Sequence, residues 1–81
     1  MAILGETKTR IMKELEDHDL HGYELARRVG IPVTGIYQHL EELFDDGLVS
    51  YQKIERRKVY SLTEKGRRLR QVLNMSPHGK Q

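Results

Sequence analysis

The most constraining feature of this 81-residue chain is a pair of short helical patterns separated by a glycine and a proline. In residues 32–46, apolar side chains recur at the spacing of one helix face, and Gly47 follows where a helix usually ends. These apolar side chains are Ile36, Leu40, Leu43 and Phe44. Residues 20–30, which read LHGYELARRVG, give a second and shorter helical pattern that closes at Gly30. We therefore expect two helices joined by a tight turn.

Two helices joined in this way form the helix-turn-helix unit, whose second helix enters the major groove of DNA. Such a helix contacts bases with its N-terminal residues, so the candidate base contacts are Thr34, Gly35, Tyr37 and Gln38. A glutamine can bond adenine in a bidentate way, and a threonine methyl group can meet thymine. The alternative is that these are ordinary solvent-facing residues on a core helix. No lysine or arginine lies in residues 32–46, so most of the affinity for DNA would have to come from elsewhere.

The remaining elements follow from the change of hydrophobic period along the chain. Residues 6–16 form a first helical pattern, with Ile3 and Leu4 as a hydrophobic lead-in. Residues 49–53 and 58–62 are β-rich runs around a four-residue tip. Thr63 is a suitable N-cap for a last helix, which we expect over residues 64–74.

Pairing Lys53 with Lys58 sets the register of the expected hairpin. One face of the hairpin then becomes apolar and covers the core. It consists of Val49, Tyr51, Tyr60 and Leu62. We assign Tyr23 and Phe44 to packing as well, the alternative for these aromatic rings being a stacking surface for single-stranded nucleic acid.

The expected fold is therefore mainly α with a small β component (α+β), in the order helix, helix, helix, β-hairpin, helix. A helix-turn-helix followed by a β-hairpin is a winged helix-turn-helix, and the hairpin tip is the wing. We expect residues 1–75 to form this one DNA-binding domain. Residues 76–81 hold Pro and Gly and no apolar side chain, and we expect a flexible tail there.

The net charge of +2 conceals an asymmetry. Residues 1–46 hold 5 Lys and Arg against 10 Asp and Glu, whereas residues 47–81 hold 9 against 2. Four basic residues gather at the expected tip, and we refer to them as the wing cations: Lys53, Arg56, Arg57 and Lys58. Arginine binds phosphate in a bidentate way and enters narrow minor grooves. Cations on a strand edge also prevent aggregation, but one or two would be enough for that. Arg27 and Arg28 would add weaker contacts to the DNA backbone.

The sequence gives little support for a metal site, an enzyme active site or a membrane-spanning segment. The chain has no cysteine, and its densest group of potential metal ligands, residues 17–21, is a single polar loop without a distant partner. We expect no metal and no cofactor, with His21 as a helix cap and His39 as a partly buried structural residue. No nucleophile–base pair, phosphate-cradling glycine loop or paired carboxylates can be found, so we do not expect an enzyme. No apolar run approaches the roughly 20 residues that span a bilayer, and we expect a cytoplasmic protein.

Several segments together resemble PadR-like transcriptional regulators. They are residues 20–25 (LHGYEL), 35–37 (GIY), 47–49 (GLV) and 59–66 (VYSLTEKG). The step Gln38-His39-Leu40 also resembles the ArsR and MarR relatives. The resemblance implies a dimeric repressor that binds double-stranded DNA, with the long helix in the major groove and the wing on the backbone or minor groove. The wing is shorter and richer in arginine than is usual in that family, and the C-terminal region is one short helix. We infer no small-molecule ligand.

A homodimer is the expected assembly, because a single small module offers little surface for specific DNA recognition. The candidate dimer interface is the apolar face of the last helix, made by Leu69, Val72 and Leu73. Met12 of the first helix is expected to join it, together with the lead-in. The alternative function is that of a winged-helix adaptor, which would bind protein without binding specific DNA.

Overall fold

The computed structural model describes residues 5–74. Its elements are α1 (Glu6–Asp17), β1 (Leu20–His21), α2 (Gly22–Val29), α3 (Val33–Asp45), β2 (Val49–Ile54), β3 (Arg57–Leu62) and α4 (Glu64–Asn74). This order confirms the winged helix-turn-helix, with one strand more than expected. The lead-in at Ile3 and Leu4 and the tail at 76–81 lie outside the described residues.

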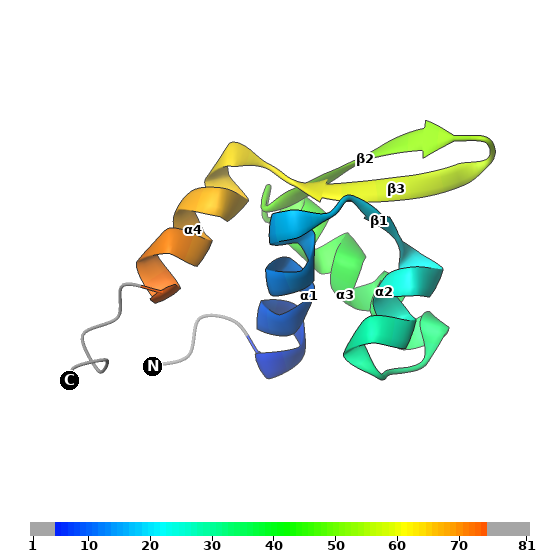
Figure 1. Ribbon diagram of the computed structural model, residues 1–81, viewed down its shortest axis with the longest axis horizontal. Coiled ribbons are helices and arrows are strands. Elements are labelled where there is room, and N and C mark those ends of the chain that lie inside the picture. The colour runs from blue at the N-terminus through cyan, green and yellow to red at the C-terminus, as the bar shows by residue number, and fades with distance from the viewer. Residues whose placement is uncertain (1–4, 75–81) are drawn as a thin grey trace.

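The first three helices pack together around one core, and the β2–β3 hairpin and α4 extend from opposite sides of this body (Figure 1). Each of the three helices contributes three side chains, and the sheet closes the core. Its members are Ile11, Met12 and Leu15 from α1; Leu25, Ala26 and Val29 from α2; Ile36, Leu40 and Leu43 from α3; and Leu48, Val49, Tyr60 and Leu62. The helical spacing of these side chains is the spacing that the sequence predicted.

The helix boundaries also confirm the sequence analysis. Gly30 and Gly47 end α2 and α3 with φ angles of 84° and 76°, which a residue with a Cβ rarely adopts. His21 is the N-cap of α2, because its Nδ1 accepts a hydrogen bond of 3.1 Å from the backbone N–H of Glu24. Thr63 caps α4 in the same way through its hydroxyl oxygen.

The hairpin has the predicted register, with Lys53 opposite Lys58. The tip is shorter than predicted: each strand continues one residue further, so only Glu55 and Arg56 form the turn. Both have positive φ angles, 50° and 72°. A two-residue hairpin turn needs this conformation because it matches the twist of the strands, and it usually selects asparagine or glycine.

A third strand was missed by the sequence analysis. In β1, Leu20 pairs with Tyr60 and His21 pairs with Val59, so the sheet has the order β1-β3-β2. Two residues are too short to show an alternating pattern, and the pairing depends on where α1 and α2 place the chain. The strand joins the start of α2 directly to β3, next to the wing.

Three aromatic side chains that were expected in the core are largely exposed. Tyr23 is 65% exposed and Phe44 is 46% exposed, so neither belongs to the core. Phe44 lies next to Leu43 on the helix, at the edge of the buried face. Tyr51 has the predicted register but is 40% exposed, because the hairpin extends beyond the helices at this point. Met12 is wholly buried in the core and therefore is not available for a dimer interface.

The start of α4 is fastened to the turn that follows α3. The Thr63 hydroxyl donates a hydrogen bond of 2.6 Å to the carbonyl oxygen of Gly47. Gly66 lies close to Leu48, the residue that follows Gly47. A Cβ on Gly66 would come within 2.2 Å of the Leu48 carbonyl oxygen. The TEKG segment therefore joins α4 to the C-terminal end of α3.

Candidate nucleic-acid interface

The N-terminal turns of α3 are open to solvent. Pro32 is the N-cap residue, and none of the described side chains caps the helix there. Thr34, Tyr37 and Gln38 are exposed, as expected of base-contacting residues, whereas Gly35 is half-buried. No acidic residue occupies the first turn. This end of the helix can therefore approach a polyanion without charge repulsion.

The acidic residues of α3 lie further along the helix. Glu42 forms an ion pair of 2.6 Å with the Lys8 ammonium of α1, which holds the pKa of the Glu42 carboxyl below its usual value. The same Lys8 nitrogen lies 3.2 Å from Nδ1 of the half-buried His39, consistent with a structural role for that histidine. Glu41 and Asp45 border a hollow of about 340 Å³ between α3 and the hairpin.

The wing cations are all exposed, and within residues 5–74 no carboxylate lies within ion-pairing distance of any of them. The Lys58 ammonium lies over the ring of Tyr51, 4.7 Å from its centroid. Tyr51 in turn contacts Phe44 and Tyr60, with ring centroids 5.4 and 5.5 Å apart. The exposed aromatic rings therefore support the base of the wing and help to orient one of its cations.

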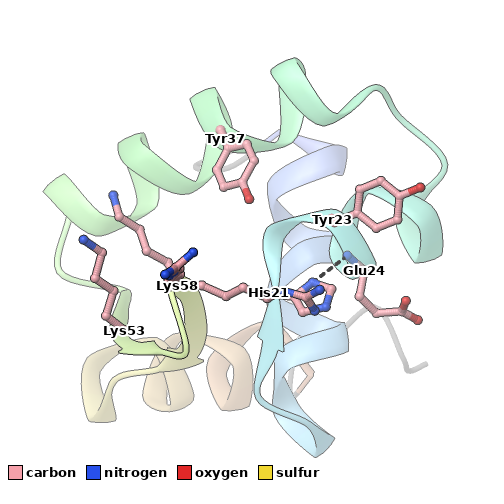
Figure 2. A pocket seen from close by; sticks show the side chains of 8 residues that line it. His21, Tyr23, Glu24, Tyr37, Lys53 and Lys58 are labelled. Atoms are coloured by element: carbon pink, nitrogen blue, oxygen red, sulfur yellow. Dashed lines mark hydrogen bonds between the residues drawn. The ribbon is translucent and has the colours of Figure 1, made fainter.

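A larger hollow, of about 750 Å³, lies between the wing, the start of α2 and the start of α3. The wing cations line it together with His21, Tyr23, Glu24 and Tyr37. Figure 2 shows the Tyr37 ring projecting from α3 into this space, with Lys53 and Lys58 on one side and Tyr23 and Glu24 on the other. The fold thus brings the predicted recognition helix and the predicted wing to one concave, mainly basic surface. We call this surface the wing–helix hollow.

Arg27 and Arg28 are placed differently. Both lie at the end of α2, and their guanidinium groups donate to the carboxylate of Glu24, with Nε–O distances of 3.1 and 3.0 Å. These hydrogen bonds hold the pKa of the Glu24 carboxyl below its usual value, and the bond from Arg27 has the larger effect. Arg28 also lies 3.4 Å from Glu14 of α1. The charge of the two arginines is partly neutralised, and their contact with DNA stays a prediction.

The predicted dimer residues on α4 differ in exposure. Leu69 is half-buried and packs against the core, whereas Val72 is 63% exposed and Leu73 is half-buried. The buried Arg70 guanidinium binds Glu16 of α1 at 2.7 Å and holds α4 against the body. The apolar side chain that α4 presents to solvent is therefore mainly Val72.

The sequence analysis did not place Tyr23 and Glu24 at the interface, although both line the wing–helix hollow. Their position next to His21 in the LHGYEL segment was the available signal. No group of three or more potential metal ligands occurs within residues 5–74. Over the same residues, no helix combines the length and the apolar character needed to cross a membrane.

Comparison with solved structures supports the fold. The MepR–DNA complex of S. aureus superposes with a TM-score of 0.85 at 18% identity, covering 89% of this chain and 63% of that chain. The zinc-responsive MarR family member ZitR of Lactococcus lactis gives 0.82 at 21% identity, covering 91% and 54%. This chain therefore spans less than two thirds of either structure, and the likeness at these identities concerns the fold.

Comparison of sequences identifies the family. A protein of Fusobacterium mortiferum named MalR, to which a regulatory role is ascribed, is 37% identical over 76 residues, or 88% of this chain and 72% of that protein. The sequence profile of the PadR-like family matches residues 11–72, which include the helix-turn-helix, the wing and most of α4. The chain therefore belongs to the PadR-like family of transcriptional regulators.

Proposed function

We propose that the protein is a repressor that binds double-stranded DNA as a homodimer. The recognition helix, about residues 32–46, enters the major groove, and the wing, residues 53–58, contacts the backbone or minor groove. The observation that carries this proposal is the wing–helix hollow, where the wing cations, which have no carboxylate partner within residues 5–74, lie near the acid-free start of α3.

The recognition helix and the wing have different roles in this proposal. Because α3 carries no lysine or arginine, its contacts to DNA are neutral: Gln38 to an adenine, and Thr34 to a thymine methyl group. The wing cations supply the affinity, since phosphate contacts hold a protein on the duplex without reading its sequence. Arg27 and Arg28 add little while Glu24 holds them.

The salt dependence of duplex binding tests this function. For a labelled duplex of random sequence, we expect log K to fall with log salt concentration with a slope of roughly −3 to −4, about −0.9 for each wing cation that binds a phosphate. Fluorescence anisotropy titrations between about 20 and 200 mM salt measure this slope. If the protein binds no duplex even at the lowest salt, DNA binding fails as the function, and the adaptor becomes the better reading.

A substitution of the exposed Val72 on α4 tests the homodimer. Specific sites usually bury about 1,000–2,500 Å² of protein surface, which one small module does not reach. In a two-fold dimer, two recognition helices would read half-sites about 34–36 Å apart. We expect Val72→Glu to leave the domain folded, because this side chain is mostly exposed, but to lower the sedimentation coefficient of the protein and its affinity for a palindromic site. Sedimentation and footprinting of the full chain measure both effects. A wild-type monomer that protects a single half-site would contradict the dimer.

A further inference from the structure

The first residue of α2, Gly22, lies directly beneath the aromatic ring of Tyr37. Gly22 is buried, and its φ angle is not positive, so the backbone itself does not require glycine there. A Cβ on Gly22 would lie 2.5 Å from Cζ of Tyr37, 2.6 Å from Cε1 and 2.7 Å from the hydroxyl oxygen. Real Cβ atoms do not approach other heavy atoms this closely. The ring can occupy its observed position only because residue 22 has no side chain.

The position of this ring matters for the interface. Tyr37 lines both the wing–helix hollow and the smaller hollow between α3 and the hairpin, and Lys58 of the wing lines both as well. The ring is 42% exposed, next to the candidate base contact Gln38, and it projects into the open space in Figure 2. A change in its orientation would alter the surface that a duplex meets between the recognition helix and the wing.

We propose that Gly22 is a positioning residue for DNA recognition. Because it has no side chain, the Tyr37 ring can pack on its backbone and keep the orientation in which it faces DNA. This inference rests on the proposed function. It gives the start of α2 an indirect role in DNA recognition, because Gly22 determines the orientation of Tyr37 on α3. The short strand β1 fixes the position of Gly22 relative to the hairpin, because His21, the residue before Gly22, pairs with Val59 of β3.

The obstruction at Gly22 differs from that at Gly66. At Gly66 the nearest atom is a backbone oxygen of Leu48, which cannot move without the chain. At Gly22 all three obstructing atoms belong to the far end of one half-exposed side chain, which can rotate into solvent. Alanine is also a better helix former than glycine, so α2 itself is not weakened. Gly22→Ala should therefore displace the Tyr37 ring and leave the fold intact.

A double-mutant cycle in the full chain tests the proposal. The variants are Gly22→Ala, Tyr37→Ala and their combination, with Gly5→Ala as the control, because a Cβ on Gly5 meets no atom of the described residues within 4 Å. The measurements are the melting temperature and the affinity for a duplex selected by the wild type from a random pool. We expect Gly22→Ala to bind this duplex on the order of tenfold more weakly, the loss of about one good contact, with an unchanged melting temperature.

In the Tyr37→Ala background, the Gly22→Ala substitution should have no further effect on affinity, because the ring that it displaces is already absent. A proton NMR signature accompanies this result: the ring should shift the Gly22 Hα resonances upfield in the wild type, and Tyr37→Ala should abolish the shift. Gly5→Ala should match the wild type in affinity and in the Gly22 resonances, and its melting temperature should fall only slightly, because alanine is a poorer N-cap than glycine.

Two results would overturn the proposal. One is wild-type affinity in Gly22→Ala. The other is an equal loss of affinity or of melting temperature with and without Tyr37, which would make Gly22 a folding residue. If the wild type binds no duplex at all, the proposed function fails and the DNA role of Gly22 fails with it. The upfield shift would then still report the contact between Gly22 and the ring, so the two failures are distinguishable.

Discussion

Gly66→Ala should destabilise the domain by about 3 kcal/mol, at the upper end of the usual cost of overpacking. The new Cβ would lie 2.2 Å from the carbonyl oxygen of Leu48 and 3.1 Å from Cδ2 of Leu62. That carbonyl also accepts the backbone N–H of Thr63 at 3.1 Å, so moving it costs a hydrogen bond as well. For a domain of this size, the melting temperature should fall by roughly 12–24 °C. Thermal and urea denaturation followed by circular dichroism measure the loss.

The control for this prediction is again Gly5→Ala, whose Cβ would meet no atom of the described residues within 4 Å. Gly5 is the N-cap of α1, where alanine is less favourable than glycine, so this variant should lose about 1 kcal/mol or less, well below the loss in Gly66→Ala. A Gly66→Ala variant with wild-type stability would show that α4 is free to move away from the turn after α3. The close approach of these two segments would then contribute nothing to holding the fold together.

The second large effect concerns the wing. Changing Arg56 and Arg57 together to alanine should weaken binding to all duplexes alike, and it should flatten the salt slope by about 1.8, or roughly 0.9 for each lost phosphate contact. Neither arginine has a carboxylate partner within residues 5–74, so no ion pair is broken and the fold should be unaffected. Anisotropy titrations of a selected and a random duplex over a range of salt concentrations measure both quantities.

A matched control removes the same charge from another place. Arg67 and Arg68 are exposed on α4, which extends from the side of the molecule opposite the hairpin (Figure 1). Changing these two to alanine gives the same net charge as the wing variant and should preserve the salt slope. Equal slopes for the two double variants would mean that binding depends on total charge rather than on the wing.

Local patterns in the sequence were sufficient to predict the helices and the hairpin register. Apolar spacing placed the buried face of each helix, and glycine, threonine and histidine marked the ends. The strand β1 was missed because two residues show no period. The turn at Glu55 and Arg56 was predicted too long because neither residue belongs to the types that usually signal a two-residue turn.

The sequence predicted part of the residues that line the candidate site, but neither the lining residues from the start of α2 nor the arrangement of the site. Charge clustering identified the wing cations, and helix position identified Thr34, Tyr37 and Gln38. Two features needed the fold: the carboxylate of Glu24 that binds both arginines of α2, and the contact between Gly22 and Tyr37. The latter joins residues on different helices, and only the angle at which α2 and α3 pack determines it. No property of either segment alone encodes that angle.

Under the proposed function, folding and DNA recognition compete for the two residues at the tip of the wing. Glu55 and Arg56 adopt left-handed backbone angles, which cost roughly 1–2 kcal/mol for each residue with a side chain. An asparagine–glycine pair would relieve this cost but would remove the guanidinium at the most protruding point of the hairpin. If Arg56 binds DNA as proposed, the tip keeps an unfavourable backbone conformation in exchange for a cation at the interface, and we expect a turn optimised for thermal stability to lower the affinity for DNA.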